Sequence, residues 1–157
     1  MLIKGIIDED LINYKKPSMT IMMPRCDFKC DRECGERVCQ NSALAVAANI
    51  NIPTNVIISR YLRNDITQAI VFQGLEPFDS RDELFNFIIQ FRLHNQDDIV
   101  IYTGYTEEEL SDNIYYLKKL KNIIIKFGRY IPHQEPHYDE ILGVQLASPN
   151  QYAKRIS

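Results

Sequence analysis

The stretch Ala69-Ile-Val-Phe-Gln-Gly-Leu-Glu-Pro77 decides the fold of this chain. Its first part, Ala69–Phe72, is a short continuous apolar run, the pattern of a strand that is covered on both faces in a parallel sheet. The run ends in a polar turn from Gln73 to Pro77. Two further runs of the same kind follow, at Ile99–Tyr102 and at Asn122–Ile125. The sequence therefore predicts three strands of one buried type.

Amphipathic helices are expected between these strands. Ser80-Arg-Asp-Glu83 is a capping-box pattern and opens an apolar periodicity that runs to Phe91. Thr106-Glu-Glu-Glu109 is a second capping box, followed by helical spacing to Leu120. Strands that alternate with helices at this distance form βαβ units, so we expect an α/β fold with a mostly parallel sheet. Ligand sites in such sheets lie beyond the carboxyl ends of the strands.

The remaining segments complete a single domain over residues 1–157. The expected elements are a short strand and connector within 1–17, a buried strand at Ser18–Met23, a loop at about 24–41, helices at Ser42–Ala48 and Val56–Leu62, a loop at 128–138 and a last strand at Ile141–Leu146. Ser42 is a plausible cap for the first of these helices. The strand at Ser18–Met23 leads directly into the loop at 24–41.

Composition restricts the classes of function. The chain has 157 residues and a net charge of -3, which argues against broad nucleic-acid binding. No apolar run approaches the roughly 18 to 20 residues that cross a bilayer, so we expect no membrane association. The N-terminus meets Asp8, Glu9 and Asp10 too early to resemble a signal peptide. These features predict a soluble, cytoplasmic protein.

All four cysteines lie in the loop at 24–41, at Cys26, Cys30, Cys34 and Cys39. Four thiols this close, among Asp, Arg, Glu and Gly residues, can meet at one point. A reducing cytosol disfavours structural disulfides, which favours metal binding. The spacing by itself leaves an iron-sulfur cluster, a structural zinc ion and uncoordinated thiols open.

Several motifs resemble the radical S-adenosylmethionine superfamily. They are Cys26-x3-Cys30 after the first buried strand, a third cysteine followed by Gln40-Asn41, and Gly74-Leu-Glu-Pro77 after the next strand. The short length, Ile101-Tyr-Thr-Gly-Tyr105 and Ser148-Pro-Asn-Gln151 are similar to the activating proteins of anaerobic ribonucleotide reductases. The resemblance covers about Gly5 to Gln151 and implies a single-domain, partial and open βα barrel.

The cysteine motif departs from the C-x3-C-x2-C pattern of that superfamily, because Glu33 stands where the third cysteine is expected. Cys39 follows apolar Val38 and precedes Gln40-Asn41, as the third cysteine of the pattern does. By this resemblance the cluster ligands are Cys26, Cys30 and Cys39. Cys34 then lies in a six-residue insertion and is the less favoured alternative ligand.

The resemblance implies a definite chemistry. Three thiolates hold a 4Fe-4S cluster, and S-adenosylmethionine chelates the open iron. Reduction of the cluster by an external donor, such as flavodoxin or ferredoxin, then cleaves S-adenosylmethionine into methionine and a 5′-deoxyadenosyl radical. The implied product is a glycyl radical on a partner glycyl-radical enzyme, an anaerobic ribonucleotide reductase. No catalytic residue is assigned beyond the cluster.

The turn after Ala69–Phe72 is implied to bind the ammonium group of S-adenosylmethionine. Glu76 matches the acidic position of the family's G-G-E-P motif. Leu75 replaces the second glycine of that motif, so the carbonyl group of Gln73 or Gly74 is an alternative contact. An ordinary strand-to-helix turn would contain the same residue types.

Two further strand ends complete the implied cofactor site. Thr103 and Gly104 occupy a position where this family contacts the ribose or the carboxylate, although a simple turn has the same residues. Lys126 interrupts an apolar strand and is a candidate for the carboxylate, or it points into solvent.

Two rival functions stay open at this stage. One is a radical enzyme that acts on a small metabolite, and the other is a non-catalytic module that binds zinc or an iron-sulfur cluster. The chain is too short for an eight-unit barrel of about 250 residues. An open side suits a protein loop as substrate better than an enclosed small molecule.

Overall fold

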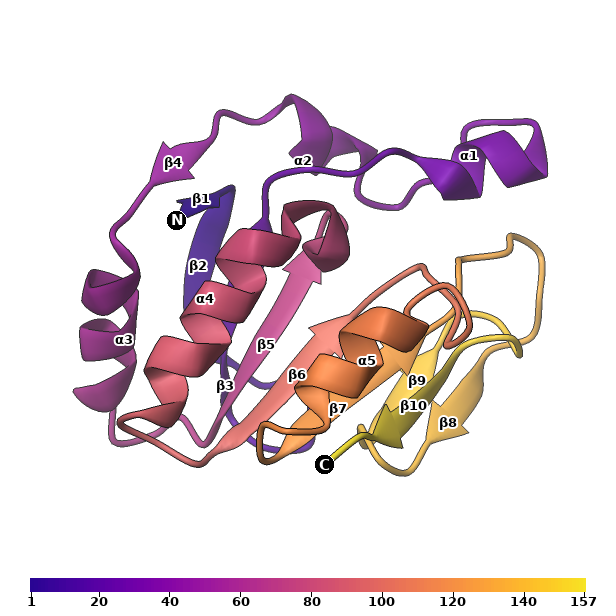
Figure 1. Ribbon diagram of the computed structural model, residues 1–157. Helices are drawn as coiled ribbons and strands as arrows, with labels where there is room; N and C mark the ends of the chain where they lie inside the picture. Colours follow the sequence, from indigo (N-terminus) through magenta and orange to yellow (C-terminus); the bar gives the residue numbers. More distant parts are fainter.

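The computed structural model describes residues 1–157 and is built around one six-stranded sheet (Figure 1). In spatial order the strands are β10 (Tyr152–Arg155), β7 (Ile123–Phe127), β6 (Asp98–Tyr102), β5 (Ala69–Gly74), β3 (Ser18–Met23) and β2 (Gly5–Asp10). The four central strands are parallel, and both edge strands are antiparallel to their neighbours. The mostly parallel α/β sheet is confirmed, and it is open.

The central strands form because their residues are apolar on both faces of the sheet. In β5, Ile70 and Phe72 pack into the larger core, whereas Ala69 and Val71 pack into the smaller one on the opposite face. The strands predicted at Ala69–Phe72, Ile99–Tyr102 and Ser18–Met23 are confirmed, and the one predicted from Asn122 begins at Ile123. Burial on both faces of the sheet explains their lack of alternation.

Three helices pack on one face of the sheet: α3 (Thr54–Leu62), α4 (Arg81–Arg92) and α5 (Ser111–Leu117). In Figure 1, α4 and α5 lie in front of the sheet and α3 lies at its left side. A 3-10 turn, η1 (Pro77–Ser80), precedes α4. The larger core of 22 residues fills this interface. Phe72 of β5 meets Phe87 of α4 edge-on, with ring centroids 5.2 Å apart. This packing fixes where the following strand ends emerge.

Only one of the two expected capping boxes forms. Thr106 Oγ1 accepts a bond from the Glu109 amide at 3.3 Å, and Glu109 Oε2 accepts one from the Thr106 amide at 2.8 Å, although regular helix begins at Ser111. The box at Ser80 and Glu83 was wrong. Ser80 caps nothing, and Glu83 Oε1 instead accepts a bond from the Leu2 amide at 2.9 Å. A tertiary partner therefore replaces the local one.

The opposite face of the sheet carries a smaller core of eight residues. It is covered by the connection around Tyr14 and by the hairpin of β8 (His137–Asp139) and β9 (Val144–Leu146), from which Leu142 and Leu146 contribute. The prediction of a last strand at Ile141–Leu146 was wrong in two respects. Only its final three residues are extended, and they pair with β8 rather than with the main sheet. The true edge strand is β10, which the sequence did not indicate.

The cysteine loop stands above the carboxyl ends of the strands, at the upper right of Figure 1. It contains α1 (Lys29–Cys34) and leads into α2 (Ser42–Val46), which is shorter than expected and has no side-chain cap from Ser42. The chain then pairs β4 (Ile50–Asn51) with β1 (Leu2–Ile3). No helix in the structure is both long and apolar enough to cross a bilayer.

Candidate functional site

A cavity of about 470 Å³ lies at the carboxyl ends of the four parallel strands. Its floor is a row of four residues from neighbouring strands. Met22 is in register with Gln73, and Tyr102 is in register with Lys126. The smaller core below this row contains Val71, so the row stands on the face of the sheet that the hairpin covers. The parallel register thus places two polar side chains, Gln73 and Tyr102, and one charged side chain, Lys126, in the cavity floor.

Three of the four cysteines line this cavity: Cys26, Cys30 and Cys39. Cys34 does not. It lines a second cavity of about 440 Å³, which it shares with Cys30, Arg129 and Tyr152. The structure therefore places Cys34 on a different cavity from Cys26 and Cys39, and Cys30 borders both cavities.

Asp31 explains how Cys39 reaches the cavity despite the insertion. Its Oδ1 atom accepts hydrogen bonds from the amides of Val38 and Cys39, at 2.9 and 2.8 Å. One side chain thereby closes the segment 32–37 into a separate loop. Gly35 ends α1 at φ 71°, a left-handed conformation that suits glycine. The chain leaves the site after Asp31 and returns to the same place at Cys39.

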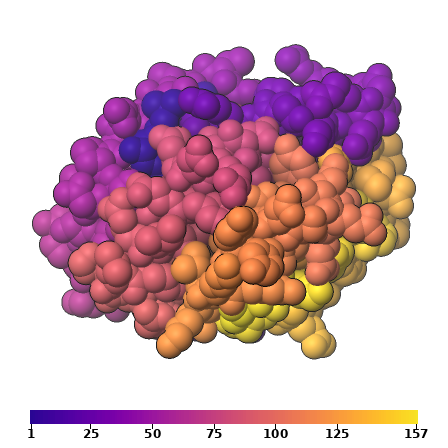
Figure 2. All heavy atoms as spheres, viewed as in Figure 1, coloured from indigo at the N-terminus to yellow at the C-terminus, as the bar shows by residue number.

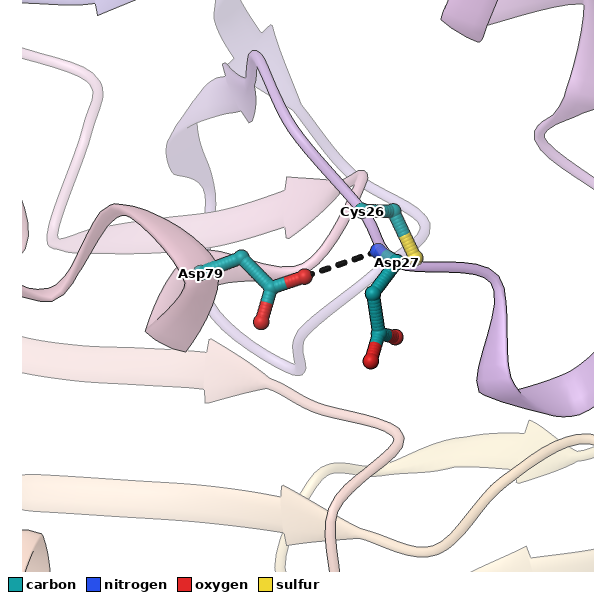
Figure 3. Close-up of side chains that lie close together, drawn as sticks. All are labelled: Cys26, Asp27 and Asp79. Atoms are coloured by element: carbon teal, nitrogen blue, oxygen red, sulfur yellow. Dashed lines mark hydrogen bonds between the residues drawn. The ribbon is translucent and has the colours of Figure 1, made fainter.

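The position of Cys26 is fixed from two sides. Phe28 adopts φ 56°, and its amide donates to Cys26 Sγ at 3.3 Å. Asp79 Oδ2 accepts a bond from the Asp27 amide at 2.8 Å, and Asp79 Oδ1 accepts one from the Tyr105 hydroxyl at 2.7 Å. Figure 3 shows the Cys26, Asp27 and Asp79 side chains close together. Because Asp79 already has two donors, we interpret these carboxylates as supports of the loop.

Arg129 attaches the insertion to the rest of the rim. Its guanidinium lies 3.2 Å from Glu33 of α1 and forms two bonds to Glu109, of 2.7 and 3.0 Å. The hydrogen bonds from Arg129 lower the pKa of Glu109 to about 2. In the space-filling view the purple atoms of the cysteine segment border orange and yellow atoms of the last third of the chain (Figure 2). The loop is therefore anchored rather than free.

Burial makes two of the thiols, Cys26 and Cys30, harder to ionise than a free cysteine. Burial raises the pKa of Cys26 to about 12, and the charges of Glu76, Asp79 and Cys39 add to this effect. Burial also raises the pKa of Cys30, although the Tyr130 backbone and the charges of Arg129 and Lys126 oppose this shift. A bound metal centre would deprotonate such thiols, because its charge stabilises the thiolate.

Glu76 is buried behind the cavity and joins two strand ends. Its Oε1 atom accepts bonds from Thr103 Oγ1 at 2.7 Å and from the Phe78 amide at 3.1 Å, and its Oε2 atom accepts one from the Gly104 amide at 2.9 Å. Burial raises the pKa of Glu76 to about 7, because these neutral donors do not replace the lost solvation. The three predicted residues Glu76, Thr103 and Gly104 thus form one connected unit.

Lys126 is only 6% exposed, so the alternative of a solvent-facing lysine is wrong. Its Nζ atom donates to the Gly128 carbonyl at 2.9 Å. Burial lowers the pKa of Lys126 to about 8, and the nearby charges of Glu76 and Cys30 oppose this shift. The cavity therefore contains one buried acid and one buried base.

The carbonyls suggested for ammonium binding are partly occupied. Asn41 Nδ2 donates to the Gly74 carbonyl at 2.6 Å, which links the cysteine loop to the end of β5. Gly74 has φ 90°, and a side chain there would collide with Leu44, 2.8 Å away. Gln73 presents its side chain to the cavity. All six predicted cofactor residues thus line one cavity together with the three thiols.

Some residues that line the cavity lie outside the sequence motifs and were not predicted. Asn13 lies in the connection after β2, and Gln145 and Ala147 come from the hairpin and the segment after it. No local pattern marks these residues, since only the packing of the hairpin on the sheet brings them to the cavity. Gln151, from the Ser148–Gln151 motif, has a structural role: its side chain bonds to the Ala147 amide and to the Gly128 carbonyl.

Comparison with known proteins gives one clear result. A family described as a 4Fe-4S single cluster domain matches residues 18–146, which is more than half of the chain. The match extends from β3 through the cysteine loop to the end of β9. No curated protein and no solved structure matches the chain.

Proposed function

Since the chain belongs to the family of 4Fe-4S single cluster domains, we propose that it uses Cys26, Cys30 and Cys39 to hold the cluster and cleaves S-adenosylmethionine to activate a partner protein. The observation that carries this proposal is the shared cavity, which contains these three thiols together with a buried acid, Glu76, and a buried base, Lys126. Membership of the family favours an iron-sulfur cluster over a structural zinc ion.

The residues around the three thiols fit a cluster with an open coordination position. Cys34, the fourth thiol, faces another cavity and is held away by the loop that Asp31 closes. A side-chain carbon on Gly104 would be in ordinary van der Waals contact with Cys30 Sγ, 3.8 Å away, so Gly104 directly borders this thiol. Three thiolates on four irons leave one iron without a protein ligand.

A cluster held by these thiols would supply, when reduced, the one electron that cleaves S-adenosylmethionine into methionine and a 5′-deoxyadenosyl radical, which would become 5′-deoxyadenosine by taking a hydrogen atom from a glycine of the partner. The chain's own residues bind and orient the molecule. We propose that Glu76 supplies the negative charge that attracts its ammonium group, and that Lys126 attracts its carboxylate. Gln73, Thr103 and Gly104 line the space between them.

The filled inner face of the sheet favours a protein substrate over a metabolite. Tyr14, Leu142 and Leu146 pack against Val71, Val100 and other strand residues below the cavity. If S-adenosylmethionine fills the cavity, a small substrate would need further space below it, and the side chains of the smaller core already fill that space. The partner's glycine would instead approach over the rim, as expected for a glycyl-radical enzyme such as an anaerobic ribonucleotide reductase.

The ligand assignment is tested by paired variants of the cysteines. After anaerobic reconstitution, Cys34→Ser should keep the iron content and visible absorption of the wild type, whereas Cys39→Ser should lose both. The reverse result would replace Cys39 by Cys34 in the ligand set. Both variants change one thiol to a hydroxyl within the same loop, so each is the control for the other.

The activity is tested with S-adenosylmethionine, a reduced donor such as flavodoxin or ferredoxin, and a candidate reductase. We expect 5′-deoxyadenosine and a glycyl radical signal by electron paramagnetic resonance. Deoxyadenosine without a glycyl radical would refute the activase function. Absence of any cleavage by a fully loaded protein would leave a non-catalytic iron-sulfur domain.

A further inference from the structure

The mouth of the cavity has an unusual composition. Of the 22 residues that line the cavity, the exposed ones are Gln40, Asn41 and Gln145, and all three carry carboxamides. The charged lining residues, Glu76 and Lys126, are 7% and 6% exposed and lie inside. A ligand that approaches from solvent therefore meets uncharged groups that both donate and accept hydrogen bonds.

Two of these carboxamides have no partner within the chain. Asn41 is used in part, since its Nδ2 atom donates to the Gly74 carbonyl at 2.6 Å. The side chains of Gln40 and Gln145 form no hydrogen bond in the structure. Gln40 comes from the cysteine loop and Gln145 from the hairpin, so two separate parts of the fold supply free carboxamides to one opening.

We infer that this carboxamide rim, Gln40 and Gln145 with Asn41 between the loop and β5, binds a stretch of uncharged peptide main chain and thereby presents the partner's glycine to the cavity. A carboxamide carries the same donor and acceptor as a peptide bond, and it pairs with main chain irrespective of the side chains. An acidic or basic segment would find no ion-pair partner among the exposed residues that line the cavity. The inference rests on the proposed function for its biological meaning, but peptide binding is measured independently of it.

The probe is a fluorescein-labelled peptide of uncharged residues around a central glycine, titrated anaerobically with the cluster-loaded protein and followed by fluorescence polarisation. Gln145→Ala and Gln40→Ala should each weaken binding by about threefold to tenfold, the effect of one lost hydrogen bond. The matched control is Gln68→Ala, because Gln68 is also exposed but precedes β5 at the opposite end of the sheet. A peptide that is N-methylated around its glycine should bind more weakly, since it lacks main-chain donors.

Gln145→Ala is the decisive variant, because Gln145 is distant in sequence from every cysteine. Iron content and visible absorption are measured for Gln40→Ala to confirm that its cluster is intact. Unchanged peptide affinity in Gln145→Ala, or no peptide binding by the wild type, would overturn the inference. So would variants that weaken only S-adenosylmethionine binding, since the carboxamides would then face the cofactor.

The inference and the proposed function fail in different ways. Deoxyadenosine formation is measured without peptide, so its absence beside normal, Gln145-dependent peptide binding would refute only the proposed function. Normal deoxyadenosine formation together with unchanged peptide affinity in Gln145→Ala would refute only the inference that the carboxamide rim binds peptide.

Discussion

Asp98 and Glu76 are both buried carboxylates that join separate parts of the sheet, at opposite ends of the parallel strands. Asp98, at the start of β6, accepts bonds from Tyr14 at 2.9 Å, Lys16 at 2.5 Å and Arg155 at 3.1 Å. Burial alone would raise its pKa, but these bonds outweigh burial and lower the pKa. Asp98 therefore stays ionised with cations that the chain provides.

Glu76, after β5, has bonds of similar length but only from neutral donors. Burial dominates there and raises its pKa to about 7. The amino end of the sheet thus has a completed ion cluster, whereas the carboxyl end keeps an acid that no side-chain cation contacts. This difference separates a structural carboxylate from one that an added cation, such as a ligand's ammonium group, can stabilise.

Replacement of Asp98 should have the largest effect on stability. Asp98→Asn removes the negative charge that holds Lys16 and Arg155, and we expect the free energy of unfolding to fall by about 3 kcal/mol. Chemical denaturation of the cluster-free protein measures this. Asp65→Asn, the same change at an exposed site, should alter stability by less than about 0.5 kcal/mol. Equal effects of the two changes would mean that the ion cluster around Asp98 does not stabilise the fold.

The two carboxylates should also give opposite pH dependences. The raised pKa of Glu76 means that the folded protein binds the extra proton, so stability falls by up to about 3 kcal/mol as the pH rises from about 4.5 to about 7. The lowered pKa of Asp98 contributes stability that is lost as the pH falls through the acidic range below 3.8. Glu76→Gln should flatten the first phase alone. Chemical denaturation at a series of pH values measures this. If the free energy of unfolding of Glu76→Gln still falls between about pH 4.5 and 7 as it does in the wild type, Glu76 is not the group that titrates there.

Lys126→Met should separate stability from ligand binding. The variant removes a buried charge whose pKa burial lowers, so the free energy of unfolding should rise by about 1 kcal/mol. Binding of S-adenosylmethionine to the cluster-loaded protein should weaken by roughly tenfold, because its carboxylate loses a cation. Calorimetry measures this affinity. Lys154→Met, at an exposed lysine of β10, serves as the control and should bind normally.

Asp31→Ala should have the smallest effect on global stability, within about 0.5 kcal/mol, because the insertion contributes nothing to the buried core. It should nevertheless reduce cluster retention, since Cys39 loses the bond that holds it beside the other thiols. Iron content after gel filtration measures retention. Glu36→Ala changes an acidic residue within the insertion, and similar losses in both variants would mean that Asp31 has no specific role.

The sequence was sufficient to predict the central strands and the meeting of their ends. Ala69–Phe72 and Ile99–Tyr102 are apolar on both faces, and a parallel sheet brings Glu76 and Thr103 to one edge. Long-range bonds explain what was missed. Glu83 binds the Leu2 amide rather than its own helix, and Gln145 reaches the cavity only through the packing of the hairpin.

For the cysteines, too, the sequence predicted which residues come together but not the hydrogen bonds that hold them there. The neighbouring residues Val38 and Gln40 indicated that Cys39 continues the motif, and the structure shows Cys39 and Cys30 on one cavity. The means of closure was not predictable. An Asp in a polar loop has many potential partners, and the two amides that Asp31 binds lie seven and eight residues away.

The loop closed by Asp31 has a consequence for how such sites are found and modified. Because one carboxylate joins the two ends of the insertion, the length of the segment 32–37 is uncoupled from the position of the thiols. Lengthening a closed surface loop costs only a slowly growing entropy, so this segment should accept an inserted reporter peptide. A search for cysteines at a fixed spacing overlooks such a chain, whereas a search that allows a loop closed by an acid after the second cysteine would find it.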